Sequence, residues 1–156
     1  MNKQDFPKNL IKGKIAEMIF EQMLRDAGGF TILGFGYEKV LPELARAQHS
    51  LEAEKTMEII RRAPDFAVIK HDKNKVYLIE VKYMHYKTDE KIKDAASKMI
   101  ASWDPSYLFV VTPAGFFIDS SRTIVDRDGK IEPLGIDHVS MELQERYTKL
   151  LNTFIE

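Results

Sequence analysis

The apolar positions along the chain recur at spacings that separate helices from strands. In residues 9–27 they recur at helical spacing, and the glycine pair 28–29 that follows predicts the end of this helix. Residues 88–103 show the same amphipathic spacing, and residues 138–155 are predicted to close the chain as a helix. Residues 43–62 are polar and compatible with a helix, with only an irregular apolar stripe.

Other segments have the composition of strands. Residues 30–41 are rich in β-branched and aromatic side chains, which predicts one long or bent strand, and Gly34 and Gly36 indicate a bulge in it. Residues 107–112 form a short continuous apolar run, as expected of a strand that is covered on both faces. The shorter strand candidates are 116–118, 123–125 and 130–132, the last two joined by a turn at Asp128-Gly129.

The strand pattern is clearest in the middle of the chain. Residues 65–69 and 76–83 are strand-like, and the charged, turn-forming residues 71–74 separate them, so we predict a hairpin. The complete order is helix, strand, helix, strand, strand, helix, strand, then short strands and a last helix. This order predicts a mixed α/β fold with helices packed against a central mixed sheet.

Length and composition narrow the class of protein. The chain has 156 residues, 44% of them hydrophobic and 30% charged, which describes one globular domain over residues 1–156. The sequence has 23 Lys and Arg residues and 24 Asp and Glu residues, so the protein is not a polycation that binds nucleic acid through its overall charge. The sequence has no cysteine, which excludes disulfides, thiolate zinc sites and a cysteine nucleophile.

The sequence also argues against a membrane or nucleotide-binding protein. No apolar run approaches the roughly 20 residues of a membrane span, and the first ten residues lack an apolar signal core, which favours a cytoplasmic location. Gly34-Phe35-Gly36 lacks the third glycine of a dinucleotide fingerprint, so no nucleotide cofactor is expected.

The predicted hairpin brings charged residues together at one end. If its turn centres between residues 72 and 73, Asp65 lies directly across from Glu80, with β-carbons about 5 Å apart. Strand alternation puts Glu80 and Lys82 on one face. The earlier positions on that face, Val76 and Leu78, are apolar, so we expect the charges where a buried strand emerges. The other face carries side chains that can pack: Tyr77, Ile79, Val81 and Tyr83.

Two carboxylates held this close repel each other unless they share a proton or a cation. A hard divalent cation with oxygen ligands, Mg²⁺ or Mn²⁺, resolves the repulsion. Such a metal polarises a phosphoryl oxygen and lowers the pKa of a bound water, and a neighbouring Lys82 can orient that water or balance developing charge. The chemistry indicated is metal-assisted hydrolysis of a phosphodiester.

These residues resemble the motif of the PD-(D/E)xK nuclease superfamily. Pro64-Asp65 is followed, after fourteen intervening residues, by Glu80-Val81-Lys82. Upstream, Gly13-Lys14-Ile15-Ala16-Glu17 is similar to a helix element of Holliday-junction-resolvase-like branches. The resemblance implies a restriction-endonuclease-like core of order αβββαβ, here with a helical insertion after the first strand. It implies an Mg²⁺-dependent DNA endonuclease, in which Mn²⁺ can substitute. It assigns Asp65, Glu80 and the Val81 carbonyl as metal ligands, Lys82 as the catalytic lysine and Glu17 as an accessory ligand.

Several alternatives stay open at this stage. Asp65 and Lys82 can form a surface ion pair, in which case Glu80 is merely a solvated edge residue. If the first helix is rotated, Glu21 takes the place of Glu17 as the accessory ligand. Lys87, Lys91 and Lys98, with His85, are candidates for contacts to nucleic-acid phosphates. A solvated helix face is the simpler explanation of the lysines, and an exposed loop position is the simpler explanation of His85.

The partner expected from this interpretation is DNA, and a homodimer is compatible with it, because cutting two strands suits two sites. A domain of the same fold that binds nucleic acid or protein, with little or no catalysis, is the alternative function.

Overall fold

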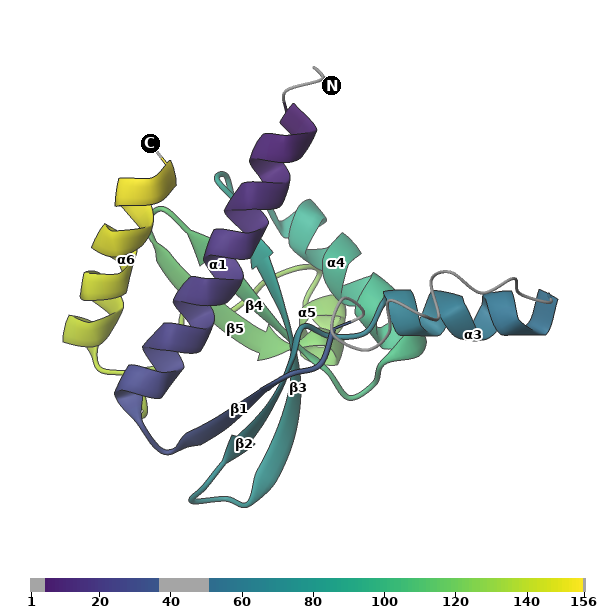
Figure 1. The fold of residues 1–156 in the computed structure, drawn as a ribbon, viewed down its shortest axis with the longest axis horizontal. Coiled ribbons are helices and arrows are strands. Elements are labelled where there is room, and N and C mark those ends of the chain that lie inside the picture. The colour runs from purple at the N-terminus through teal and green to yellow at the C-terminus, as the bar shows by residue number, and fades with distance from the viewer. Residues whose placement is uncertain (1–4, 37–50, 156) are drawn as a thin grey trace.

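A five-stranded mixed sheet forms the centre of the fold, and helices cover both of its faces (Figure 1). The computed structural model describes residues 5–36 and 51–155. The strands lie in the order β1-β2-β3-β4-β5, and all neighbours are antiparallel except β3 and β4, which are parallel. The elements are α1 (Asp5–Ala27), β1 (Phe30–Gly34), α3 (Leu51–Arg61), β2 (Phe66–Lys70), β3 (Lys75–Tyr83), α4 (Asp89–Ser102), β4 (Tyr107–Thr112), β5 (Gly115–Ser120), α5 (Ser121–Asp126) and α6 (Met141–Ile155).

The larger hydrophobic core lies between the sheet and the helices α1 and α6. The ring of Phe20 in α1 is fully buried and lies 5.1 Å from the ring of Phe66 and 4.7 Å from that of Phe109. Helix α6 contributes Tyr147 and Leu151 to the same core. Removing this much aromatic surface from water is what holds α1 across the middle of the sheet.

A smaller core lies on the opposite face, under α4 and α5. Ile92 and Ala96 of α4 and Ile124 of α5 pack there on Leu108 and Val110 of β4. The alternate β4 residue Phe109 faces the α1 side, so β4 is buried on both faces, as its continuous apolar run predicted. Thr88 caps the start of α4, because its side chain accepts a hydrogen bond from the Lys91 N–H at 3.2 Å.

The structure confirms the hairpin and its register. The ladder between β2 and β3 runs from Lys70↔Lys75 to Phe66↔Ile79, which is the pairing that the turn at residues 71–74 predicted. The next position outward on the two strands holds Asp65 and Glu80. The hairpin therefore places these two carboxylates opposite each other just where the ladder ends.

Two short strand predictions are wrong. Residues 123–125 lie in helix α5, because the Ser120 side chain accepts a hydrogen bond from the Thr123 N–H and begins a helix there. Residues 130–132 are not a strand, and this stretch makes only one bridge to the sheet, between Phe117 and Pro133. The Asp128-Gly129 turn exists with positive φ at both residues, but it follows a helix instead of joining two strands.

The first predicted strand and the helix after it differ from the structure in their extent. The strand β1 ends at Gly34. Just beyond it the N–H groups of Phe35 and Gly36 both bond to the carbonyl of Asp65, so two residues oppose one, as in the bulge that Gly34 and Gly36 indicated. Helix α3 begins at Leu51 and projects beyond the edge of the sheet (Figure 1). Residues 37–41 of the predicted strand and 43–50 of the predicted helix lie outside the described residues.

The face of β3 that carries Glu80 and Lys82 is more exposed than its sequence suggested. Val76 is 56% exposed, because the end of the β2–β3 hairpin extends past the helices (Figure 1). The expectation that the two charges appear where a buried strand emerges is therefore wrong on this face. On the other face Ile79 and Val81 are buried, as predicted. None of the helices in the described part of the chain is long and apolar enough to cross a membrane.

Candidate active site at the end of the hairpin

Asp65 is held in place by hydrogen bonds from two neighbouring segments. Its backbone carbonyl accepts from the N–H groups of Phe35 and Gly36, at 2.9 and 3.2 Å, at the end of β1. Its side-chain Oδ2 accepts from the N–H of Val81 at 2.9 Å, on the neighbouring strand β3. The buried Pro64 precedes it and restricts the backbone that enters the strand. The carboxylate is thus oriented by the backbone around it.

Glu17 reaches the same point from helix α1. Its carboxyl group hydrogen-bonds to Asp65, and Asp65 hydrogen-bonds to Glu80. Lys14, one turn earlier on α1, lies 3.4 Å from Glu17 and forms an ion pair with it. Glu21, the substitute considered for Glu17, forms an ion pair with Arg25 at 2.9 Å instead. The orientation of α1 therefore brings Glu17, and not Glu21, into contact with Asp65.

Two of these carboxyl groups, Glu17 and Asp65, have raised pKa values. Burial, the negative charge of Asp65 and the hydrogen bond to it raise the pKa of Glu17 to about 7, although Lys14 acts in the opposite direction. Burial together with the hydrogen bond and charge of Glu80 raises the pKa of Asp65 to about 8. A carboxyl group with so high a pKa holds a proton near neutral pH, and a cation placed among these groups would release it.

Lys82 stands beside these carboxylates on the open side of the site. It is exposed and lines, together with Glu17, Asp65 and Glu80, a hollow of about 400 Å³. A second hollow of about 340 Å³ continues from this one along the start of α1 to Tyr83. The predicted residues of the motif therefore meet at one solvent-accessible depression.

The structure separates the four residues predicted to contact nucleic acid. Lys98 lies beside the site, because it lines a smaller hollow that also contains Glu80 and Lys82, and it forms an ion pair with Asp94 at 3.1 Å. The other three, Lys87, Lys91 and His85, do not line these hollows. Lys87 lies over the ring of Phe117 at 4.7 Å from its centre, and His85 contacts the hydroxyl of Tyr83 at 3.1 Å.

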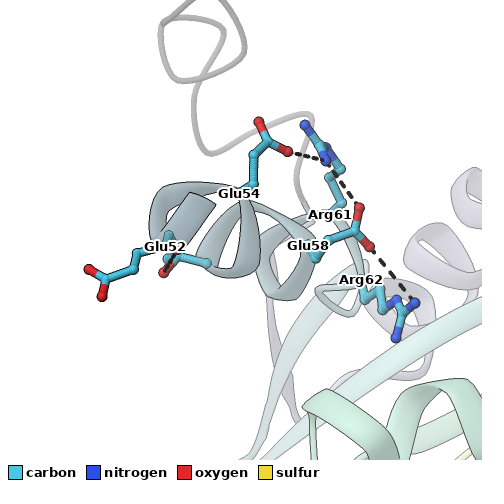
Figure 2. A network of polar contacts seen from close by, with 6 residues as sticks. Glu52, Glu54, Glu58, Arg61 and Arg62 are labelled. Carbon is cyan, nitrogen blue, oxygen red and sulfur yellow. Dashed lines mark hydrogen bonds and ion pairs between the residues drawn. The ribbon is translucent and has the colours of Figure 1, made fainter. Parts of the chain in front are cut away.

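Sequence reasoning missed the basic residues that α3 brings to the site. Arg61, at the end of α3, lines the 400 Å³ hollow. Its Nη1 lies 3.1 Å from Glu58 and 3.6 Å from Glu54, and Glu58 also pairs with Arg62 at 3.8 Å (Figure 2). The Trp103 Nε1–H, at the end of α4, donates a hydrogen bond of 2.9 Å to the carbonyl of Ile59 and so anchors this end of α3. The only signal in the sequence was two arginines just before Pro64-Asp65.

The donor atoms of the site suit a hard divalent cation. As the side chains stand, no three His, Cys, Asp or Glu residues of the described chain surround one point closely enough to hold a metal ion. Glu17, Asp65 and Glu80 are linked by hydrogen bonds instead, and these require protons between the carboxyl groups. Oxygen ligands are those that Mg²⁺ and Mn²⁺ prefer, and they bind once deprotonated. The assignment of the Val81 carbonyl as a ligand stays a prediction.

Comparison with known proteins adds no assignment. No protein-family model matches the chain, and no curated protein matches its sequence.

Proposed function

We propose that this protein is a metal-dependent nuclease of the PD-(D/E)xK type that hydrolyses phosphodiester bonds within DNA. The observation that carries the proposal is the contact of three carboxyl groups from three separate elements, Glu17, Asp65 and Glu80, with an exposed lysine beside them in one hollow. Chance placement of acidic side chains does not favour such contact, because like charges repel.

The fold supports this proposal through the order of its elements. Helix α1, the antiparallel strands β1 to β3, the crossover helix α4 and the parallel strand β4 would be the αβββαβ core under this proposal. Helix α3, which lies between β1 and β2 in the chain, would be the helical insertion after the first strand. In this arrangement the motif residues occupy the end of the hairpin, where a bound phosphodiester has room.

The residues of the site have separable roles under this proposal. Asp65, Glu80 and Glu17 would hold Mg²⁺ or Mn²⁺, which supplies charge stabilisation and a water of lowered pKa. The Val81 N–H keeps the Asp65 side chain oriented. Lys82, which lines the same hollow, would hold the attacking water and balance the negative charge that develops on the phosphate. Arg61 and Lys14 add positive charge at the mouth of the hollow, where the nucleic-acid backbone would lie.

The decisive experiment compares the wild type with Lys82→Ala on single-stranded, duplex and branched DNA in Mn²⁺. We expect the wild type to cleave at least one of these substrates and Lys82→Ala to be slower by about 10²-fold or more. Lys73→Ala, in the exposed hairpin turn, is the matched control and should cleave like the wild type.

A second readout separates chemistry from metal binding. Both the wild type and Lys82→Ala should melt at a higher temperature in millimolar Mn²⁺, since the carboxylates are intact in both. Equal and negligible cleavage by both on every substrate would contradict the proposal. If such inactive proteins still bound DNA, the alternative, a nucleic-acid-binding domain of this fold, would replace it.

A further inference from the structure

Another, larger hollow lies on the α1 face of the sheet, away from the carboxylates. It has a volume of about 540 Å³, and residues of α1, of strands β1 to β5 and of the segment that leads into α6 line it. It shares no lining residue with the 400 Å³ hollow around Asp65. Its volume falls in the range of roughly 300–1,000 Å³ that small-molecule sites occupy.

Five Phe and Tyr residues are among those that line this hollow. The rings of Tyr77 and Tyr107 stand edge to face, with centres 5.0 Å apart, and both are half-buried at the side of the hollow. Phe20 and Phe109 lie at its base, and Phe30 stands near its end. Within the described residues neither tyrosine hydroxyl has a protein hydrogen-bond partner. Such walls suit a flat, apolar ring that can pack edge to face or offset against them.

One end of this hollow carries a buried positive charge. Lys70, the last residue of β2, is only 8% exposed. Its ammonium donates a hydrogen bond to Nε2 of His138, whose ring lies 6.2 Å from that of Phe30. In the part of the chain that the structure describes, no carboxylate forms an ion pair with Lys70. A buried ammonium whose one partner is an imidazole nitrogen lacks the counter-ion that buried charges ordinarily have.

The acidic residues of the hollow restrict where an anion can lie. Asp119 is on β5, three strands away from Lys70 across the sheet, and it accepts a hydrogen bond from the Ser120 N–H. Asp137 is exposed in the segment before α6. Neither carboxylate neutralises Lys70, but each repels an anion from its own part of the rim. The end formed by Lys70 and His138 is therefore where negative charge is best accommodated.

We propose that this hollow is a binding site for a small aromatic carboxylic acid. The carboxylate of the ligand pairs with the Lys70 ammonium and reaches His138, and its ring packs against the aromatic wall that Tyr77 and Tyr107 form together. The site is independent of the nuclease proposal, because none of its residues lies at the carboxylate cluster.

The test uses three probes of the same shape and different charge: 2-naphthoate, 2-naphthol and 2-naphthylmethylamine. Calorimetry on the wild type should show 2-naphthoate binding at least about ten-fold more tightly than the other two. Lys70→Met should remove this preference, and Lys82→Ala should retain it. Equal affinity for all three probes, or no binding of 2-naphthoate, would overturn the proposal.

A second measurement tests the site even if the Lys70→Met variant does not fold. Methyl NMR of the wild type should show 2-naphthoate shifting Ile79, Ile118 and Leu134, which line the hollow, and not Ile92 or Ile124 under α4. His138→Leu, at an exposed position, should lower the affinity for 2-naphthoate without unfolding the protein. Shifts confined to other surfaces would refute the site. The proposal would also be refuted if two copies of the chain met through this hollow. Ultracentrifugation would then show a dimer, and the dimer would not bind 2-naphthoate.

Discussion

Replacing Asp65 with Asn should stabilise the metal-free protein, although it removes a central group of the candidate site. Asp65 contacts both Glu17 and Glu80, and its ionised form is disfavoured there by burial and by the charge of Glu80. Asn keeps a side-chain oxygen that can accept the hydrogen bond from the Val81 N–H, which is now 2.9 Å from Oδ2. Ala would leave this buried N–H unpaired, so Asn isolates the effect of charge.

The size of the effect follows from the raised pKa. The folded protein raises the pKa of Asp65 to about 8, so it retains a proton that the unfolded chain loses above about pH 4. The free energy of unfolding therefore falls as the pH rises from about 4 to 8 and levels off above that. A pKa raised by about four corresponds to a loss of about 6 kcal/mol in the free energy of unfolding if nothing screens the charge. Because the site is open to water, which screens the charge, we expect a loss of about 2–3 kcal/mol.

Thermal unfolding in EDTA at pH 8.5 and pH 6 measures this difference. For a chain of this length, about 2–3 kcal/mol corresponds to a melting temperature roughly 5–10 °C higher for Asp65→Asn at pH 8.5. At pH 6 the wild-type carboxyl group is mostly protonated, so the difference should shrink to about half. Asp72→Asn, at an exposed position in the hairpin turn, is the matched control and should change stability by less than about 0.5 kcal/mol.

Melting temperatures measured with Mn²⁺ present test the same reasoning from the side of metal binding. Mn²⁺ should raise the melting temperature of the wild type and of Asp72→Asn, and should have little effect on Asp65→Asn, because it has lost a ligand. The reasoning is refuted if Asp65→Asn is no more stable than the wild type at pH 8.5 in EDTA. It is refuted equally if Mn²⁺ stabilises both proteins by the same amount.

Two further predictions concern residues around the site and under helix α4. Arg61→Gln should raise the KM for DNA about three- to ten-fold with little change in kcat, because Arg61 lines the mouth of the hollow; an unchanged KM in steady-state assays would argue against this role. Gly129→Ala should destabilise the protein by about 3 kcal/mol in urea unfolding, since an added Cβ would lie 1.9 Å from the Asp89 carbonyl oxygen at a φ of +90°. Gly13→Ala, where nothing lies within 4 Å, is its control and should be neutral or stabilising by up to about 1 kcal/mol.

The secondary structure was predictable where local spacing alone decides it. The strand β4 matches its predicted range, 107–112, because a run that is apolar at every position suits a strand covered on both faces. Prediction failed where a neighbour decides the outcome. Residues 123–125 have a strand-like composition, but the cap at Ser120 begins a helix and the edge position next to β4 is already taken by β5.

The same distinction between local pattern and tertiary contact applies to the candidate site. The sequence by itself determined that Asp65 and Glu80 lie opposite each other, because the length of the turn sets the register of a hairpin and the register sets the pairs. Only the tertiary structure decided that Glu17 contacts Asp65 and that Arg61 lines the same hollow. Those contacts depend on how α1 is rotated against the sheet and where α3 ends. Interactions between residues distant in sequence fix both, such as the packing of Phe20 on Phe109 and the hydrogen bond from Trp103 to the Ile59 carbonyl. Periodicity encodes neighbours within an element, whereas packing between elements selects which faces meet.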